Sequence, residues 1–179
     1  SAAGPITVTT VNDTVDGDTS SIANLIATPG PDTFISLREA ITAANNEATG
    51  STINFGVTGC GGVCVFTPSP DLPSLAVNGI VINGYSQPGS AVSTGGPFAG
   101  NRAVILIRVD GGCGCNAIGL EIAASNVTIS GLSITGYSTA AIQITSGSGS
   151  IVSGNFLGIT PASVAVSNDL GVLVLASSS

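Results

Sequence analysis

The chain has 179 residues, which fits a single domain, and its net charge is −7 with only three basic residues, Arg38, Arg102 and Arg108. So few cations argue against a nucleic-acid partner and against docking on an anionic membrane surface. Because 43% of the residues are hydrophobic and only 7% are charged, we expect a large apolar core beneath a surface rich in serine and threonine.

The first expected element is a strand at residues 6–11, in which Ile6, Val8 and Val11 supply apolar positions. An acidic segment follows, and its candidate calcium ligands are the carboxyl groups of Asp13, Asp16 and Asp18. The spacing of these acids is not that of an EF-hand, and an acidic turn ahead of a helix is the alternative interpretation. We therefore expect no cofactor, and calcium binding by these acids is the alternative.

Residues 36–46 carry the clearest helix signal of the chain. Ser36 can act as the N-cap, and Glu39 three residues later completes a capping box. The apolar positions form one stripe at Leu37, Ala40, Ile41 and Ala44. A helix of about three turns is marginal alone, so we expect it to lie on the open end of a β-solenoid. The single domain then has a strand and helical cap in residues 1–50 and β-structure in residues 51–179.

After the helix, short strand patterns recur at nearly constant spacing. Residues 129–134 match residues 152–157 at an offset of 23, and residues 81–85 match residues 128–132 at an offset of 47, close to two repeats. A second series consists of residues 119–122, 141–144 and 171–174. Within each unit, apolar residues alternate with hydroxyl-bearing ones, as in a strand with one buried face.

Helix-free repeats of roughly 20–30 residues predict an all-β fold, a parallel β-helix. Its coils would stack at about 4.8 Å, and five or six of them would fit between Thr52 and Ala176. Asn78 and Asn126 are spaced for an asparagine ladder along this stack. A leucine-rich fold would need the Leu-x-x-Leu-x-Leu motif, which the sequence lacks. A β-sandwich of many short strands is the remaining alternative.

The heptapeptide Ile-Ser-Leu-Arg-Glu-Ala-Ile at residues 35–41 resembles the Cys-Ser-Leu-Arg-Glu-Ala-Ile motif of exported right-handed parallel β-helix proteins of bacteria and archaea. Flanking segments also look like that family at residues 7–16, 52–55, 72–75, 82–89 and 153–158. The resemblance covers most of the chain and implies a right-handed β-helix in a secreted or surface protein. The family's leading cysteine is Ile35 here, so any disulfide made by that cysteine is absent.

The four cysteines form two close couples, Cys60 with Cys64 and Cys113 with Cys115. Their spacings match neither a Cys-x-x-Cys redox motif nor a zinc ribbon, so we expect structural disulfides, with zinc binding or free thiols as alternatives. A Cys-x-Cys bridge would be strained, which favours pairing between the first couple and the second.

We expect no catalytic site, because the acidic residues show none of the paired-carboxylate patterns of polysaccharide hydrolases. A lyase-like group could form if Arg108 and Asp110 shared one strand face beside Glu121 on the next coil, and a surface ion pair is the alternative. Tyr85 and Tyr137 are candidate sugar-stacking residues, with isolated exposed tyrosines as the alternative.

Several features favour a secreted or cell-surface location. The cysteine count is even, lysine is absent, and the chain begins Ser-Ala-Ala-Gly, as an exported protein does after removal of its signal peptide. Asn12 and Asn126 each begin an Asn-x-Thr sequon and are candidate glycosylation sites. No apolar run reaches the length of about 18 residues that a membrane-spanning helix needs, so we expect no membrane insertion.

The functional hypothesis is a structural protein that self-associates, for example as a filament subunit. The last strand pattern, residues 169–176, has no polar cap after it, and exposed strand edges are templates for association. The candidate assembly residues are Ile6, Val8, Val11, Val172 and Val174. One alternative is a carbohydrate-binding module or a fragment of a polysaccharide lyase or hydrolase, with a polysaccharide partner. Another is the N-terminal part of a longer adhesin.

Overall fold

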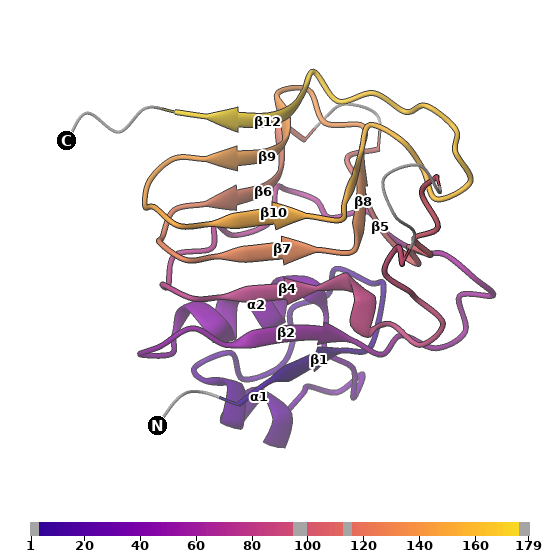
Figure 1. Cartoon of the computed structure of the whole chain (residues 1–179). Helices are drawn as coiled ribbons and strands as arrows, with labels where there is room; N and C mark the ends of the chain where they lie inside the picture. The colour runs from indigo at the N-terminus through magenta and orange to yellow at the C-terminus, as the bar shows by residue number, and fades with distance from the viewer. Residues whose placement is uncertain (1–3, 95–99, 113–115, 176–179) are drawn as a thin grey trace.

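The computed structural model describes residues 4–94, 100–112 and 116–175, and within them the chain is mostly β-structure in three parallel sheets (Figure 1). Sheet A has the order β1 (Ile6–Val8), β2 (Thr52–Phe55), β4 (Val81–Asn83), β7 (Thr128–Ser130) and β10 (Ile151–Ser153). Sheet B has the order β11 (Phe156–Leu157), β8 (Leu132–Thr135), β5 (Ile107–Asp110) and β3 (Cys64–Phe66). Sheet C has the order β12 (Leu170–Val174), β9 (Ala140–Ile144) and β6 (Ile118–Ile122).

The chain visits the three sheets in the fixed order A, B, C. One round is β4, β5 and β6, the next is β7, β8 and β9, and the last is β10, β11 and β12. An earlier round consists of β2, β3 and Leu75. Leu75 lies at the position of sheet C, where it forms a parallel bridge with Ile122 of β6. We expected five or six coils, and the described residues form fewer. Residues 84–106 and 158–169 lie outside the three sheets, so these residues are not available for further rounds.

The register confirms most of the predicted repeat. Ile129 pairs with Val152 and Ile134 with Leu157, which is the offset of 23. The second series also holds, since β6, β9 and β12 lie side by side in sheet C. The offset of 47 is one round rather than two: Ile82 pairs directly with Ile129, and the extra length is the excursion after β4. All pairs between named strands are parallel, unlike those of a β-sandwich.

Inward columns of aliphatic side chains form the core. In sheet A, Ile53, Ile82 and Ile129 lie in one register column and are completely buried. Their neighbours face outward, and Asn83 donates a hydrogen bond of 3.4 Å to Asn54 on the strand below. The expected ladder between Asn78 and Asn126 was wrong, because the amide oxygen of Asn78 accepts from the Ser125 backbone N–H instead.

The predicted helix is confirmed as α2 (Leu37–Asn45), with the Ser36 cap and both halves of the capping box in place. Its apolar stripe is buried, and α2 packs against β1 and β2 at the start of the stack (Figure 1). The sequence analysis missed the short helix α1 (Ile22–Ala27), which packs on α2 and is capped by the Ser21 side chain. It also missed the short 3₁₀ turn η1 (Gly84–Ser86) after β4.

The buried carboxylate of Glu39 fastens the acidic segment to α2. One of its oxygens accepts from the backbone N–H groups of Asp16 and Gly17, at 2.9 and 2.8 Å. The other accepts from the Ser36 N–H at 2.9 Å. Glu39 is only 1% exposed, so these three donors replace the water that the charge loses on folding. Thus Glu39 does more than complete a capping box.

Tyr137 lies in the core rather than on the surface. It is 2% exposed, and its hydroxyl has no hydrogen-bond partner among the described residues. Burial raises the pKa of this phenol well above its ordinary value, and the carboxylates of Asp71, Asp110 and Asp13 raise that pKa further. The expectation that Tyr137 is exposed and could stack on a sugar was therefore wrong.

We predict that Glu39→Gln lowers the free energy of unfolding by roughly 3 kcal/mol. Both oxygens of Glu39 accept hydrogen bonds, and the glutamine NH₂ group that replaces one of them cannot accept. At least one buried backbone N–H then has no acceptor. The measurement is urea unfolding followed by circular dichroism. Glu47→Gln is the matched control: Glu47 is partly exposed and accepts one backbone N–H, that of Ile22, at 2.8 Å. A loss from Glu39→Gln no larger than the loss from Glu47→Gln would contradict the central role of Glu39.

We also predict that Tyr137→Phe changes stability little near pH 7 but protects the protein in alkali. A phenol whose folded pKa is raised stabilises the fold fully below its unfolded pKa of about 10, and this contribution disappears as the pH rises above that value. The chain has no lysine, so its two tyrosines dominate the titration in this range. The free energy of unfolding should fall less for Tyr137→Phe than for the native chain between about pH 9 and about pH 11.5. Equal falls would show that Tyr137 ionises freely in the folded protein.

Candidate functional site

The last round of strands leaves one end of the three sheets open. Strands β10, β11 and β12 each pair with one neighbour, and their other edges carry no strand among the described residues. In Figure 1 the final strand β12 lies at the end of the molecule opposite α1. Large apolar side chains are exposed on these strands and directly after them, namely Ile151, Leu170, Val172, Val174 and Leu175.

Two exposed apolar residues of this end, Leu170 and Val172, continue columns of the core, whereas Ile151 is in register with the partly exposed Thr128. Val172 is in register with Ile142, which in turn is in register with Leu120. Ile142 and Leu120 are 0% and 1% exposed, whereas Val172 is 42% exposed. The three side chains share one face of the sheet, and among the described residues no further strand covers Val172. Val152 likewise continues the column of Ile129.

The opposite end is closed differently. There α1 and α2 cover the start of the stack, and in the part of the chain that the structure describes sheet A alone has an additional strand, β1. Ile6 and Val8 of β1 are completely buried in their own sheet, while Val11 lies beyond the strand and is partly exposed. The predicted assembly residues therefore fall into two groups, with Val172 and Val174 on the open surface and Ile6 and Val8 inside the fold.

The structure forms the ion pair expected as the alternative to a lyase-like group. Arg108 and Asp110 lie on one face of β5 with 2.8 Å between guanidinium and carboxylate. The Arg108 side chain also donates to the Thr135 hydroxyl at 2.9 Å. Glu121 lies in a different sheet, on β6, in register with Gln143.

The three candidate calcium ligands have separate partners or positions. Asp13 pairs with Arg38 at 2.7 Å and accepts from the Ser69 N–H. Asp18 accepts from the hydroxyl and the N–H of Ser20, and these two hydrogen bonds hold the pKa of the Asp18 carboxyl below its usual value. Among the described residues, no three acids, cysteines or histidines gather in a way that could hold a metal ion. Calcium binding by this segment stays an untested alternative.

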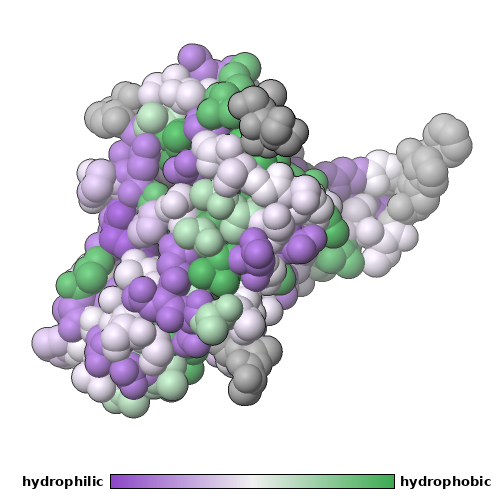
Figure 2. All heavy atoms as spheres, turned by 90° about the vertical axis from the view of Figure 1, so that its left-hand side faces the viewer, coloured by the Kyte–Doolittle hydropathy of each residue, from purple (hydrophilic) through white to green (hydrophobic). Residues whose placement is uncertain are grey.

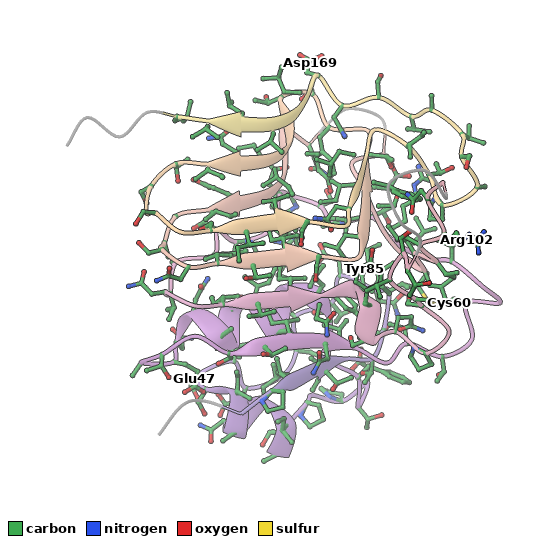
Figure 3. The ribbon with its side chains drawn as sticks, in the orientation of Figure 1. Glu47, Cys60, Tyr85, Arg102 and Asp169 are labelled. Carbon is green, nitrogen blue, oxygen red and sulfur yellow. A yellow bond between two sulfur atoms is a disulfide. The ribbon has the colours of Figure 1, made fainter. Side chains whose placement is uncertain are left out.

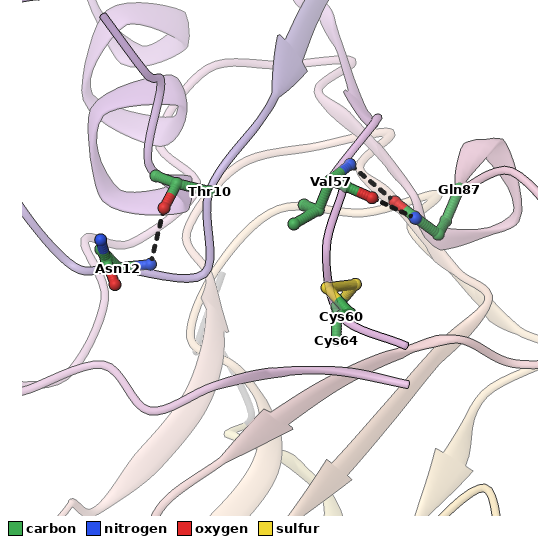
Figure 4. Close-up of a disulfide and its surroundings, with 6 residues drawn as sticks. All are labelled: Thr10, Asn12, Val57, Cys60, Cys64 and Gln87. Carbon is green, nitrogen blue, oxygen red and sulfur yellow. Dashed lines mark hydrogen bonds between the residues drawn. A yellow bond between two sulfur atoms is a disulfide. The ribbon is translucent and has the colours of Figure 1, made fainter. Parts of the chain in front are cut away.

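Cys60 and Cys64 form a disulfide with each other (Figure 4), so the expected pairing of this couple with the second was wrong. The glycines between them explain the local bridge. Gly61 and Gly62 adopt φ values of +63° and +143°, which turn the chain back and bring the two Cα atoms to 5.1 Å. Cys113 and Cys115 lie outside the described residues.

The remaining candidate residues are found at the surface. Asn12 and Asn126, the sequon asparagines, are both exposed, and Asn126 sits in a turn with φ +58°. Tyr85 is partly exposed, and its hydroxyl donates to the Gly154 carbonyl oxygen at 2.7 Å. Hydrophilic, neutral and hydrophobic residues are intermingled over the side of the molecule shown in Figure 2. Accessibility is thus consistent with glycosylation, whose occurrence stays a prediction.

No helix among the described residues is long and apolar enough to span a bilayer. Comparison of the chain with protein-family models, with curated proteins and with solved structures finds no match.

Proposed function

We propose that the chain is a secreted or cell-surface structural protein, a right-handed parallel β-helix that joins further copies of itself through its open end. The observation that carries this proposal is the exposure of Leu170 and Val172 on the last strand, in register with the completely buried Ala140 and Ile142. A face of this kind is stable in water when another strand layer covers it.

The order of the sheets supports the β-helix. Three successive rounds of A, B and C, each joined to the next by parallel pairing, are what a chain coiling around one axis produces. The right hand follows from the strong preference of parallel strand crossovers, about 98% of which are right-handed. The buried columns shared by successive rounds then run along the axis of the coil.

The two edges of sheet A favour a head-to-tail contact. Strand β10 is one edge of the sheet and β1 is the other, and all pairs in the sheet are parallel. If one copy is moved along the stacking axis, its β1 comes to lie beside β10 of the next copy. The two strands then run parallel to each other, as all neighbours in sheet A do. Such a contact does not close on itself, so repetition gives a filament. Exchange of β1 between copies is a variant, but it requires withdrawing the buried Ile6 and Val8.

Composition supports the same proposal. The strands of the open end contain no charged residue, and Asp169 directly precedes the last of them. Few charges therefore need to lose water when two copies meet. A secreted location is supported by the disulfide between Cys60 and Cys64, since such bonds persist in oxidising compartments.

We predict that the double variant Val172→Lys and Val174→Lys raises the protein concentration needed for assembly by more than about tenfold, because lysines on an edge strand must be desolvated when a copy docks. Val174 is 64% exposed and Val172 is 42% exposed, so the isolated chain should lose only about 1 kcal/mol. The measurement is sedimentation combined with electron microscopy over a concentration series.

Val92→Lys provides the matched control. Val92 is 55% exposed but lies in the excursion between β4 and β5 rather than on a strand of the open end. Filaments of the native chain and of Val92→Lys, together with monomers of the double variant, are the expected result. A native chain that stays monomeric at high concentration would refute self-assembly and favour the view that the open end receives more coils of a longer adhesin.

A further inference from the structure

A small hollow lies at the corner where sheet A passes into sheet B, away from the strands of sheet C. Its volume is about 280 Å³, and its lining includes Tyr85, Ser93, Asn101, Ser153, Gly154 and Phe156. These residues come from η1, from the excursion between β4 and β5, and from the β10–β11 corner. Three segments distant in sequence thus meet around one cavity, and Figure 3 shows Tyr85 at this corner below β8.

Glycines hold Tyr85 in place as one wall of the hollow. A Cβ atom added to Gly131 would lie 2.8 Å from the tyrosine ring, and one added to Gly154 would lie 2.8 Å from its hydroxyl oxygen. Both glycines have positive φ, +73° and +64°. The ring therefore lies directly on backbone, and its hydroxyl is anchored to the Gly154 carbonyl oxygen at 2.7 Å. A ring fixed in this way loses little freedom when a ligand binds.

The lining combines aromatic surface with uncharged polar groups. None of its side chains is an acid or a base other than the Tyr85 phenol, and burial raises the pKa of that phenol above its ordinary value. Asn101 uses its side-chain oxygen to accept from the Ala103 N–H, and no described residue accepts from its NH₂ group. The exposed Ser153 hydroxyl also has no described partner. Donors and acceptors therefore remain for a ligand.

We propose that this hollow binds one ring of a neutral saccharide. The apolar C–H face of a pyranose fits beside the rings of Tyr85 and Phe156, and its hydroxyls can bond with Asn101 and Ser153. The volume lies at the lower end for ligand pockets, about 300 Å³, which suits a single ring. None of the described lining residues is a cation, which disfavours acidic sugars and phosphates. This proposal does not depend on self-assembly.

Saturation-transfer NMR with the full chain tests the proposal, and it works on monomers and on large assemblies. The probes are the neutral methyl glycosides of glucose, galactose, mannose and N-acetylglucosamine, and the charged comparator is the methyl glycoside of galacturonic acid. At least one neutral glycoside should receive saturation on the protons of one ring face, and the charged comparator should receive much less. Tyr85→Ala should weaken that binding by roughly tenfold.

The matched control is Phe34→Ala, which removes another exposed aromatic ring, 46% exposed and outside the hollow. Binding should persist in this variant. Ser153→Ala is a second variant that leaves the packing of Tyr85 untouched, and it should weaken binding by about threefold through the lost hydrogen bond. The proposal is overturned if no neutral glycoside binds, if the charged comparator binds as well, or if folded Tyr85→Ala or Ser153→Ala binds like the native chain.

Discussion

Each strand of this protein must place its inward side chains directly over those of the strand one round earlier. Ile53, Ile82 and Ile129 show the constraint, since they share one column and are completely buried. A slip of one residue would turn the column outward and bring polar side chains into the core. The constraint applies only at the strands. The chain can leave the sheets after β4 for a long excursion and still return with Ile82 beside Ile129. The excursions can therefore carry surface features such as the hollow beside Tyr85.

A stack of this kind has two ends, and the two are different here. At the start, α1 and α2 cover the stack, and the buried Glu39 carboxylate fastens the acidic segment to α2 by accepting from three backbone N–H groups. At the finish, apolar residues of the last round face solvent, as Val172 does above Ile142. This asymmetry gives the molecule a direction, and the proposed head-to-tail association is its simplest consequence.

Much of the fold could be predicted from short-range patterns. The capping box at Ser36 and Glu39 defined α2, and the alternation around Ile129 and Ile134 gave the correct partners at Val152 and Leu157. Pattern alone could not show how many residues a round contains when excursions interrupt it, so the number of rounds was overestimated. Helix α1 was missed because six residues with only two buried positions carry almost no periodic signal.

The candidate sites were harder to predict, because they depend on contacts between distant segments and on backbone turns. The disulfide between Cys60 and Cys64 was missed although Gly61 and Gly62 between the cysteines were the available signal. The burial of Tyr137 was not evident from its polar neighbours in sequence. By contrast, Val172 and Val174 were predicted as surface residues for assembly from their apolar strand pattern, and both are exposed in the structure.

The contact between Tyr85 and Gly154 has a mechanical consequence. Tyr85 follows β4, whereas Gly154 follows β10, and β7 lies between these two strands in sheet A. A force that peels off the last round would break ladder hydrogen bonds one after another, as a zipper opens. Tyr85 reaches across the round that contains β7. Its hydrogen bond to Gly154 and its packing on Gly131 must therefore break at the same time as the hydrogen bonds between β10 and β7. The corner between sheets A and B should therefore resist tension better than the corner at the opposite side, and rupture under load should begin at β12.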